Sequence, residues 1–194
     1  MESKKFGFSQ ILTVLLVLFT LVYLFSARVK SWVIMGFLAL GFYNPHIPVI
    51  KPGEKLQPAP ALVVQTVDGK VLNLQQQKGK VVFINFWASW CPPCLAELPS
   101  VNDLYLKVKD NPNIVFLSID ADNKLLKSSL FLKNRGYMFP VYSGDLTLPP
   151  TFYSGSIPTT LVINKKGNVV FNHIDKANYA DKEFVQYLTD LGKE

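Results

Sequence analysis

The stretch VVFINFWASWCPPCLAELP, residues 81–99, determines the fold that the rest of the chain must complete. Its first seven residues, 81–87, form an almost continuous apolar run, which is typical of a strand covered on both faces. A helix is predicted from Pro93 to Lys109, and residues 114–119 return as a second buried strand. Strand, helix and strand within about forty residues form a βαβ unit, so the two strands are expected to be parallel.

The chain on either side of this unit alternates in the same way. Asp-Gly and Lys-Gly turns between apolar runs indicate two β-hairpins, and apolar residues three and four apart indicate a carboxyl-terminal helix. The expected strands are 61–67, 70–74, 160–164 and 168–172, and the expected helices run from Asp122 or Asn123 to Arg135 and through the stripe Phe184, Tyr187, Leu188 and Leu191. The sequence therefore predicts an α/β fold, with a mixed central sheet and helices on both faces.

Both cysteines of the chain, Cys91 and Cys94, lie where the first buried strand gives way to the helix. The first turn of a helix has unpaired N–H groups and the positive end of the dipole, so a thiolate at Cys91 is stabilised and becomes nucleophilic near neutral pH. Two intervening residues allow the sulfurs to meet in a small disulfide ring. We therefore predict a redox-active pair, with a passive pair of buried thiols as the alternative.

Glu97 lies one turn after Cys94, on the face of the helix that enters the core. A buried carboxylate is costly unless it has a partner or a chemical role. A raised pKa would suit Glu97 to exchange a proton with Cys94. The alternative is a glutamate at the rim of the core, with its carboxylate in water.

Metal and haem uses of the cysteine pair are less well supported. A structural zinc ion needs four ligands, and the only other candidates are His46 and His173, which are far apart in the sequence. Covalent haem attachment would need a histidine directly after Cys94, where Leu95 stands. We therefore expect no metal ion and no cofactor.

An excess of apolar residues is concentrated at the amino end of the chain. Hydrophobic residues make up 49% of the sequence, and Phe6 to Ala27 is a stretch without a charge. As a helix, these residues would span about 33 Å, enough for a hydrocarbon core of about 30 Å. With Lys4 and Lys5 before it, this stretch predicts a retained membrane anchor over residues 1–30. A cleaved signal peptide and a buried globular helix are the alternatives.

Two further segments separate the anchor from the domain. Trp32 to Tyr43 is too short to cross a bilayer as a helix, and we interpret it as an interfacial helix. The alternative is the second half of a helical hairpin. Five prolines between Asn44 and Pro60 predict an extended spacer, so residues 31–57 are assigned to the interfacial segment and linker, and 58–194 to the domain. The net charge is +6, but the basic residues are scattered, which gives no nucleic-acid footprint.

The motif FWASWCPPC at 86–94, followed by Glu97, Pro99 and IPTT at 157–160, resembles the thioredoxin superfamily. Within it, the chain is similar to the TlpA/ResA-like branch of membrane-tethered, extracytoplasmic thiol-disulfide oxidoreductases. This resemblance implies that Cys91 attacks a substrate disulfide, that Cys94 resolves the mixed disulfide, and that Glu97 is the active-site acid.

The resemblance also implies a substrate-binding surface and partners. Pro158 matches a cis-proline that packs against the disulfide, although the residues alone leave its isomer open. The Ile157 backbone would pair with an extended substrate segment, and Trp90 and Pro92 would form part of the docking surface. The implied partners are a disulfide-bearing protein substrate and a membrane electron donor. The implied setting is the periplasmic side of the membrane, in cytochrome c maturation or envelope disulfide reduction.

Two departures from relatives qualify this expectation. Cytosolic thioredoxins usually carry a buried aspartate where Asn85 stands, so proton transfer falls more heavily on Glu97. Strongly oxidising relatives place a histidine between the cysteines, whereas this chain has Pro92 and Pro93, which favours a reductant or a mid-potential exchanger. A thiol peroxidase on the same fold and a tethered metal-binding or chaperone module are the alternative functions.

Overall fold

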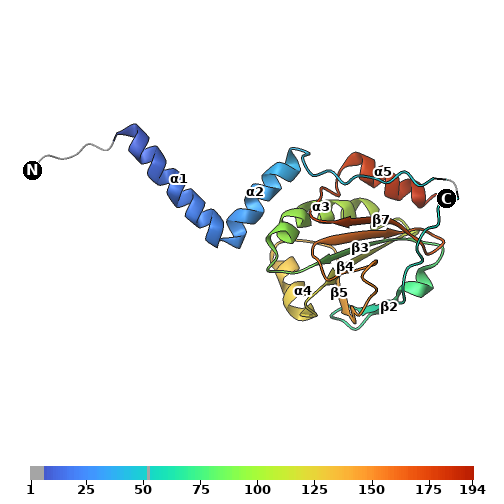
Figure 1. Ribbon diagram of the computed structural model, residues 1–194. Coiled ribbons are helices and arrows are strands. Elements are labelled where there is room, and N and C mark those ends of the chain that lie inside the picture. Colours follow the sequence, from blue (N-terminus) through green and yellow to red (C-terminus); the bar gives the residue numbers. More distant parts are fainter. Residues whose placement is uncertain (1–6, 52) are drawn as a thin grey trace, which may run out of the picture.

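A mixed seven-stranded sheet forms the centre of the computed structural model, which describes residues 7–51 and 53–194 (Figure 1). The strand order is β2-β1-β5-β4-β3-β6-β7, with β3, β4 and β5 mutually parallel and the remaining pairs antiparallel. The strands are β1 Val63–Gln65, β2 Val71–Asn73, β3 Val81–Trp87, β4 Ile114–Asp120, β5 Val141–Gly144, β6 Thr159–Ile163 and β7 Val169–Ile174. The helices are α1 Phe8–Phe25, α2 Ala27–Ala39, the 3-10 helix η1 Leu74–Gln77, α3 Pro92–Val108, α4 Leu125–Asn134 and α5 Lys182–Leu191.

Every residue of β3 is buried, because each face of the sheet has its own apolar cluster. Phe83 and Trp87 pack with residues of α3, α4 and α5 on one face. Ile84 and Phe86 pack on the other face, where the Tyr153 ring stacks on Phe86 at a centroid distance of 4.2 Å. The predicted mixed sheet is confirmed. Its α-helices were predicted on both faces but gather on the first, because the β3–α3–β4 and β4–α4–β5 crossovers advance across the sheet in the same direction. The second face is covered by η1 and by segment 145–157.

Two local predictions differ from the structure. Strand β5 was not expected, because its four residues contain serine and glycine and form no recognisable apolar run. The predicted cap of α4 at Asp122 or Asn123 is wrong. The N-cap is Lys124 without a side-chain bond, and the carboxylate of Asp120 accepts instead from the N–H groups of Asp122 and Lys124, at 3.1 and 2.7 Å.

The described part of the amino-terminal apolar stretch forms one helix, α1, and α2 follows it after a single residue. Ser26 ends α1 and caps α2, because its hydroxyl accepts from the N–H of Val29. Within the described residues no single helix is long and apolar enough to cross a membrane. The bent pair Phe8–Leu24 and Val29–Leu38, with 95° between its halves, meets that requirement by length and composition together. Lys4 and Lys5, expected before the anchor, lie outside the described residues.

Helix α2 begins earlier than the interfacial helix that we expected from Trp32 to Tyr43, and it ends at Ala39. It packs against α3, the helix that follows the cysteines, and buries Ser31 and Leu38. Among its described residues, the linker that follows has no helix, as predicted. It lies along the β6–β7 hairpin, where the carbonyl of Gln57 accepts from the N–H of Val169 at 2.8 Å. Pro52 of this linker lies outside the described residues.

Candidate active site

Cys91 and Cys94 form a disulfide at the start of α3, with their Cα atoms 5.3 Å apart. Cys91 is the N-cap residue, in an extended conformation, and Pro92 and Pro93 occupy the first two helical positions. These positions suit prolines because their N–H groups would have no partner within the helix. The Cys91 sulfur accepts from the N–H of Cys94 at 3.3 Å. A thiolate at Cys91 would therefore gain a hydrogen bond and the field of the helix amino end.

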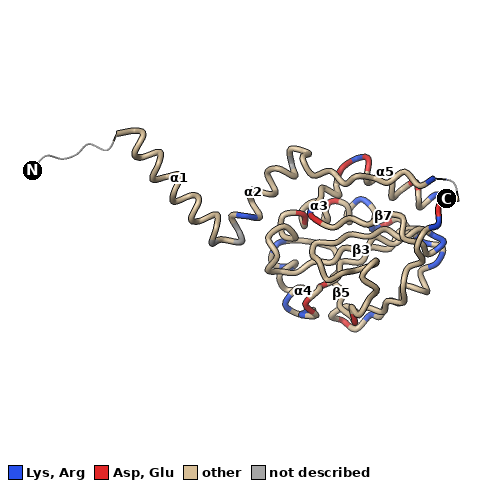
Figure 2. The backbone as a smooth tube through the Cα atoms, viewed as in Figure 1, with Lys and Arg blue, Asp and Glu red and all other residues tan. Residues whose placement is uncertain are grey.

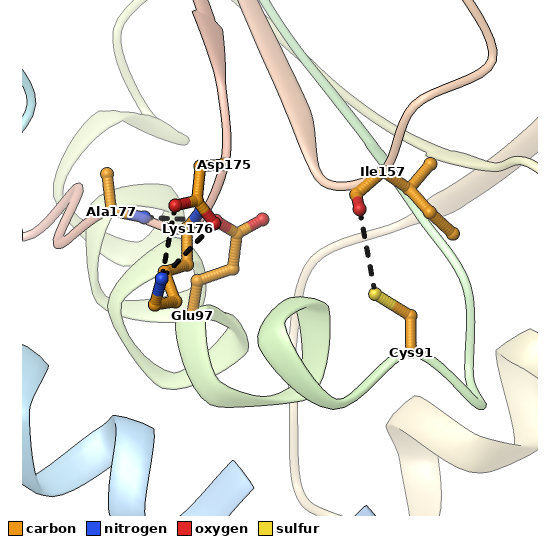
Figure 3. A network of polar contacts seen from close by, with 6 residues as sticks. All are labelled: Cys91, Glu97, Ile157, Asp175, Lys176 and Ala177. Atoms are coloured by element: carbon orange, nitrogen blue, oxygen red, sulfur yellow. Dashed lines mark hydrogen bonds and ion pairs between the residues drawn. The ribbon is translucent and has the colours of Figure 1, made fainter. Parts of the chain in front are cut away.

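The two cysteines differ only slightly in exposure. Cys91 retains 3% of its surface in the disulfide form and Cys94 retains none. The Cys91 sulfur lies 3.9 Å from the carbonyl oxygen of Ile157, to which a reduced thiol can donate (Figure 3). The Ile157 backbone therefore borders the approach to the Cys91 sulfur.

Three other predicted site residues surround this approach. The Ile157–Pro158 peptide is cis, and Pro158 is buried at the start of β6. Trp90 leaves 58% of its surface exposed, and its indole N–H donates to Asp122 Oδ2 at 2.6 Å. Pro92 is partly exposed on the adjoining helix turn. The structure thus brings Trp90, Pro92, Ile157 and Pro158 around Cys91, and no sequence pattern had indicated Asp122 as the residue that orients Trp90.

Glu97 is completely buried on α3, so the alternative of a glutamate at the rim is wrong. Its Oε1 accepts from Asn85 Nδ2 at 2.8 Å, and its Oε2 accepts from the N–H of Ala177 at 3.3 Å. Burial raises the pKa of Glu97 to about 8, against the opposing effect of these two hydrogen bonds. The carboxyl group therefore carries a proton at neutral pH while the disulfide is formed.

Asn85 connects Glu97 to Thr160, beside which lies Tyr179, a buried residue that the sequence did not identify. Asn85 Nδ2 also donates to Thr160 Oγ1 at 2.9 Å. The oxygen of the same amide and the hydroxyl of Tyr179 are buried without a hydrogen-bond partner among the described residues. Burial, followed by the charge of Glu97, raises the pKa of Tyr179 well above its ordinary value. Thr160 was visible within the IPTT motif, but nothing in the sequence placed Tyr179 beside it.

Two charged residues from the end of β7 complete the surroundings of Glu97. Figure 3 shows Asp175, Lys176 and Ala177 gathered beside its carboxyl group. The negative charge of Asp175 adds to the raised pKa of Glu97, and the positive charge of Lys176 opposes it. Lys176 Nζ lies 3.1 Å from Asp175 Oδ2. The site thus joins a disulfide at a helix amino end to a buried acid one turn behind it, which can supply or accept a proton as the disulfide opens or closes.

Comparisons with known proteins agree with this geometry. Residues 51–188 match the Redoxin family. Over 121 residues the chain is 39% identical to the thiol-disulfide oxidoreductase ResA of a Bacillus cereus strain, and the match covers 60% of this chain and 69% of that protein.

Solved structures show the same architecture. A putative protein disulfide isomerase from Bacteroides thetaiotaomicron superposes with a TM-score of 0.60 and 29% identity, over 73% of this chain and 91% of that one. A putative thiol:disulfide interchange protein DsbE from Chlorobium tepidum gives a TM-score of 0.60 and 25% identity, over 72% of this chain and 98% of that one. The predicted thioredoxin-like fold is therefore confirmed.

Proposed function

Because this chain belongs to the Redoxin family, as a TlpA/ResA-like thiol-disulfide oxidoreductase of the thioredoxin superfamily, we propose that it is a membrane-tethered enzyme that reduces disulfides of extracytoplasmic proteins. The observation that carries this proposal is the Cys91–Cys94 disulfide at the amino end of α3, with the buried Glu97 one turn behind it. The resemblance to the TlpA/ResA-like branch implies cytochrome c maturation or envelope disulfide reduction as the setting.

In this mechanism the Cys91 thiolate attacks one sulfur of the substrate disulfide and expels the other as a thiolate. Cys94 then transfers its proton to the carboxylate of Glu97 and attacks the Cys91 sulfur. This second step closes the Cys91–Cys94 disulfide and releases the second substrate thiolate. The substrate has gained two electrons, which the protein must recover from a membrane electron donor.

Recovery of those electrons uses the same groups in reverse. A donor thiolate attacks Cys91, the Cys94 thiolate leaves, and Glu97 returns its proton to it. The second thiolate of the donor then attacks the donor sulfur of this mixed disulfide, which releases the Cys91 thiolate and leaves the donor oxidised to a disulfide. The raised pKa of Glu97 suits this step, because the acid is protonated at neutral pH in the disulfide form. The direction of net reduction is supported by Pro92 and Pro93, because they place no imidazole between the cysteines to stabilise the thiolate further.

The mechanism predicts that Cys94→Ser will accumulate mixed disulfides with its substrates in intact cells. Serine cannot attack the mixed disulfide, and the chain contains no third thiol to do so. The adducts would be detected as reductant-sensitive bands of higher mass and identified by mass spectrometry. Cys91→Ser is the matched control, since it retains the other cysteine. Equal adduct formation by the two variants would contradict the assignment of Cys91 as the attacking residue.

Tethering is supported by α1, which has no charged residue (Figure 2) and exposes its apolar side chains along most of its length. We expect the full chain to stay with membranes after carbonate extraction, and the double variant Leu16→Arg/Val17→Arg to be released. Each arginine at the middle of a span costs about 3 kcal/mol. Ser9→Arg, at the amino end of α1, is the control and should remain with membranes. A parent chain recovered in the carbonate supernatant would contradict tethering.

A further inference from the structure

The first residues after α2 are attached to the loop between β7 and α5. The carbonyl of Tyr43 accepts from the N–H of Asn178 at 2.9 Å. The amide of Asn44 donates to Asp181 Oδ1 at 3.1 Å. The segment that leaves the membrane-proximal helices is therefore fastened to the domain at residues 178–181, before the linker continues along the sheet.

The same loop holds the buried acid from its other side. The N–H of Ala177 donates to Glu97 Oε2. The hydroxyl of Ser100 donates to the carbonyl of Glu97 at 2.8 Å and lies 3.3 Å from the carbonyl oxygen of Ala177. Ser100 Oγ also accepts from the N–H of Tyr179 at 3.2 Å. The loop thus lies between the membrane-proximal segment and α3, with hydrogen bonds to both.

Lys176 contacts the membrane-proximal segment through Tyr43 and also acts electrostatically on Glu97. Its ammonium group lies 4.1 Å from the centroid of the Tyr43 ring, and only 14% of the side chain is exposed. A cation over an aromatic face is attracted by the ring quadrupole, and the ring also covers it from water. Asp175, which precedes it, adopts a φ of +120°, a conformation that a side chain disfavours, and its N–H donates to the carbonyl of Pro158 at 3.1 Å. Contacts of the folded domain therefore fix the direction in which Lys176 leaves the backbone.

We propose that Tyr43 positions Lys176 beside Glu97, so that the membrane-proximal segment completes the proton-transfer site of the domain. This inference rests on the proposed proton-transfer role of Glu97. Lys176 and Tyr43 are positioning residues here, because neither touches the reacting sulfurs. The proposal makes the acidity of Glu97 depend on a residue 54 positions earlier in the chain, outside the thioredoxin-like domain.

The direction of the effect follows from the charges around Glu97. The charged or titratable groups that face it are Asp175 and Lys176 at the end of β7, Tyr179 in the loop and, once the disulfide is open, Cys94 on α3. Lys176 favours the carboxylate, and Asp175 disfavours it. If the Lys176 side chain moves into solvent, Asp175 is left without its partner and the pKa of Glu97 rises further.

The test uses the full oxidised chain in detergent micelles. Protonation of Glu97 is followed by infrared difference spectroscopy, with Glu97→Gln identifying its carboxylic acid band. Lys176→Met should raise the midpoint by about 1 pH unit, the size expected for loss of a nearby opposite charge. Tyr43→Ala should raise it in the same direction, and Tyr43→Phe should leave it unchanged because the ring remains. Phe42→Ala is the matched control, since its ring contacts Phe37.

A second readout separates this inference from the proposed function. The rate at which dithiothreitol thiolate opens the disulfide should fall as Glu97 loses its proton, and this fall should move to higher pH in Lys176→Met and Tyr43→Ala. If Lys176→Met shifts both readouts but Tyr43→Ala shifts neither, the role of Tyr43 is wrong. If neither variant shifts the infrared midpoint, the whole inference is wrong. If Glu97→Gln shows the parent's pH dependence of opening, the proton-transfer role itself fails, whatever the midpoints.

Discussion

Replacement of Cys91 by serine is expected to lower the rate of disulfide exchange by at least about 10³-fold, because a serine hydroxyl does not ionise near neutral pH and is a far weaker nucleophile than a thiolate. The environment that stabilises a thiolate would remain intact, with the N–H of Cys94 directed at residue 91 at the start of α3. Oxidation of the reduced protein by a disulfide-bonded peptide, followed in single turnovers by tryptophan fluorescence, measures this rate.

Cys94→Ser provides the matched control for that measurement. It should react once with the peptide at a rate within about tenfold of the parent, since Cys91 is retained, and then stop as the mixed disulfide. Both variants lose the disulfide, so any loss of stability is common to them and their comparison isolates the nucleophile. A Cys91→Ser protein that still reduces the peptide at the parent rate would show that the attacking group lies elsewhere.

The part of the fold that sequence reasoning predicted is the part that short-range patterns specify. The apolar run 81–87 became β3, and α3 begins at Pro92, one residue before the predicted start. The cysteines could be placed at that junction because they follow the apolar run closely in the sequence. Gly136, with a φ of +73°, ends α4 as expected for a glycine in the left-handed region.

Features that depend on distant partners were not predictable. Strand β5 is only four residues long, and its pairing with β1 and β4 depends on residues far from it in sequence. The hydrogen bond from Asn85 to Thr160 joins positions 75 residues apart. Ser26 separates α1 from α2, but nothing in the sequence showed that the second helix begins at Ala27, since it was expected only from Trp32. The loop that holds Glu97 through Ala177 could not be assigned, because a backbone N–H leaves no signature in sequence.

Glu97→Gln is expected to remove a loss of stability that the parent suffers as the pH rises through the neutral range. Burial raises the pKa of Glu97 from 4.5 to about 8, so the folded protein keeps a proton that the unfolded chain releases. The stabilising contribution is therefore complete below about pH 4.5, falls as the pH rises and is lost above about pH 8. Glutamine does not titrate. The free energy of unfolding of the variant, relative to the parent, should rise by roughly 4 kcal/mol between pH 4 and pH 9.

Urea unfolding of the oxidised proteins at a series of pH values measures this difference. The change with pH is the informative quantity, because glutamine has one acceptor oxygen for the two donors, Asn85 and Ala177, and so carries a constant penalty at every pH. Glu183→Gln, which removes an exposed carboxylate from α5, controls for the loss of one negative charge. The contradicting result is a difference in the free energy of unfolding between Glu97→Gln and the parent that changes between pH 4 and pH 9 no more than the difference for Glu183→Gln does. Folded Glu97 would then not keep a proton that the unfolded chain releases. The buried acid could then not protonate Cys94 when the disulfide opens, although exchange through Cys91 would remain. The stability measurement thus tests the proton-transfer step separately from the nucleophilic one.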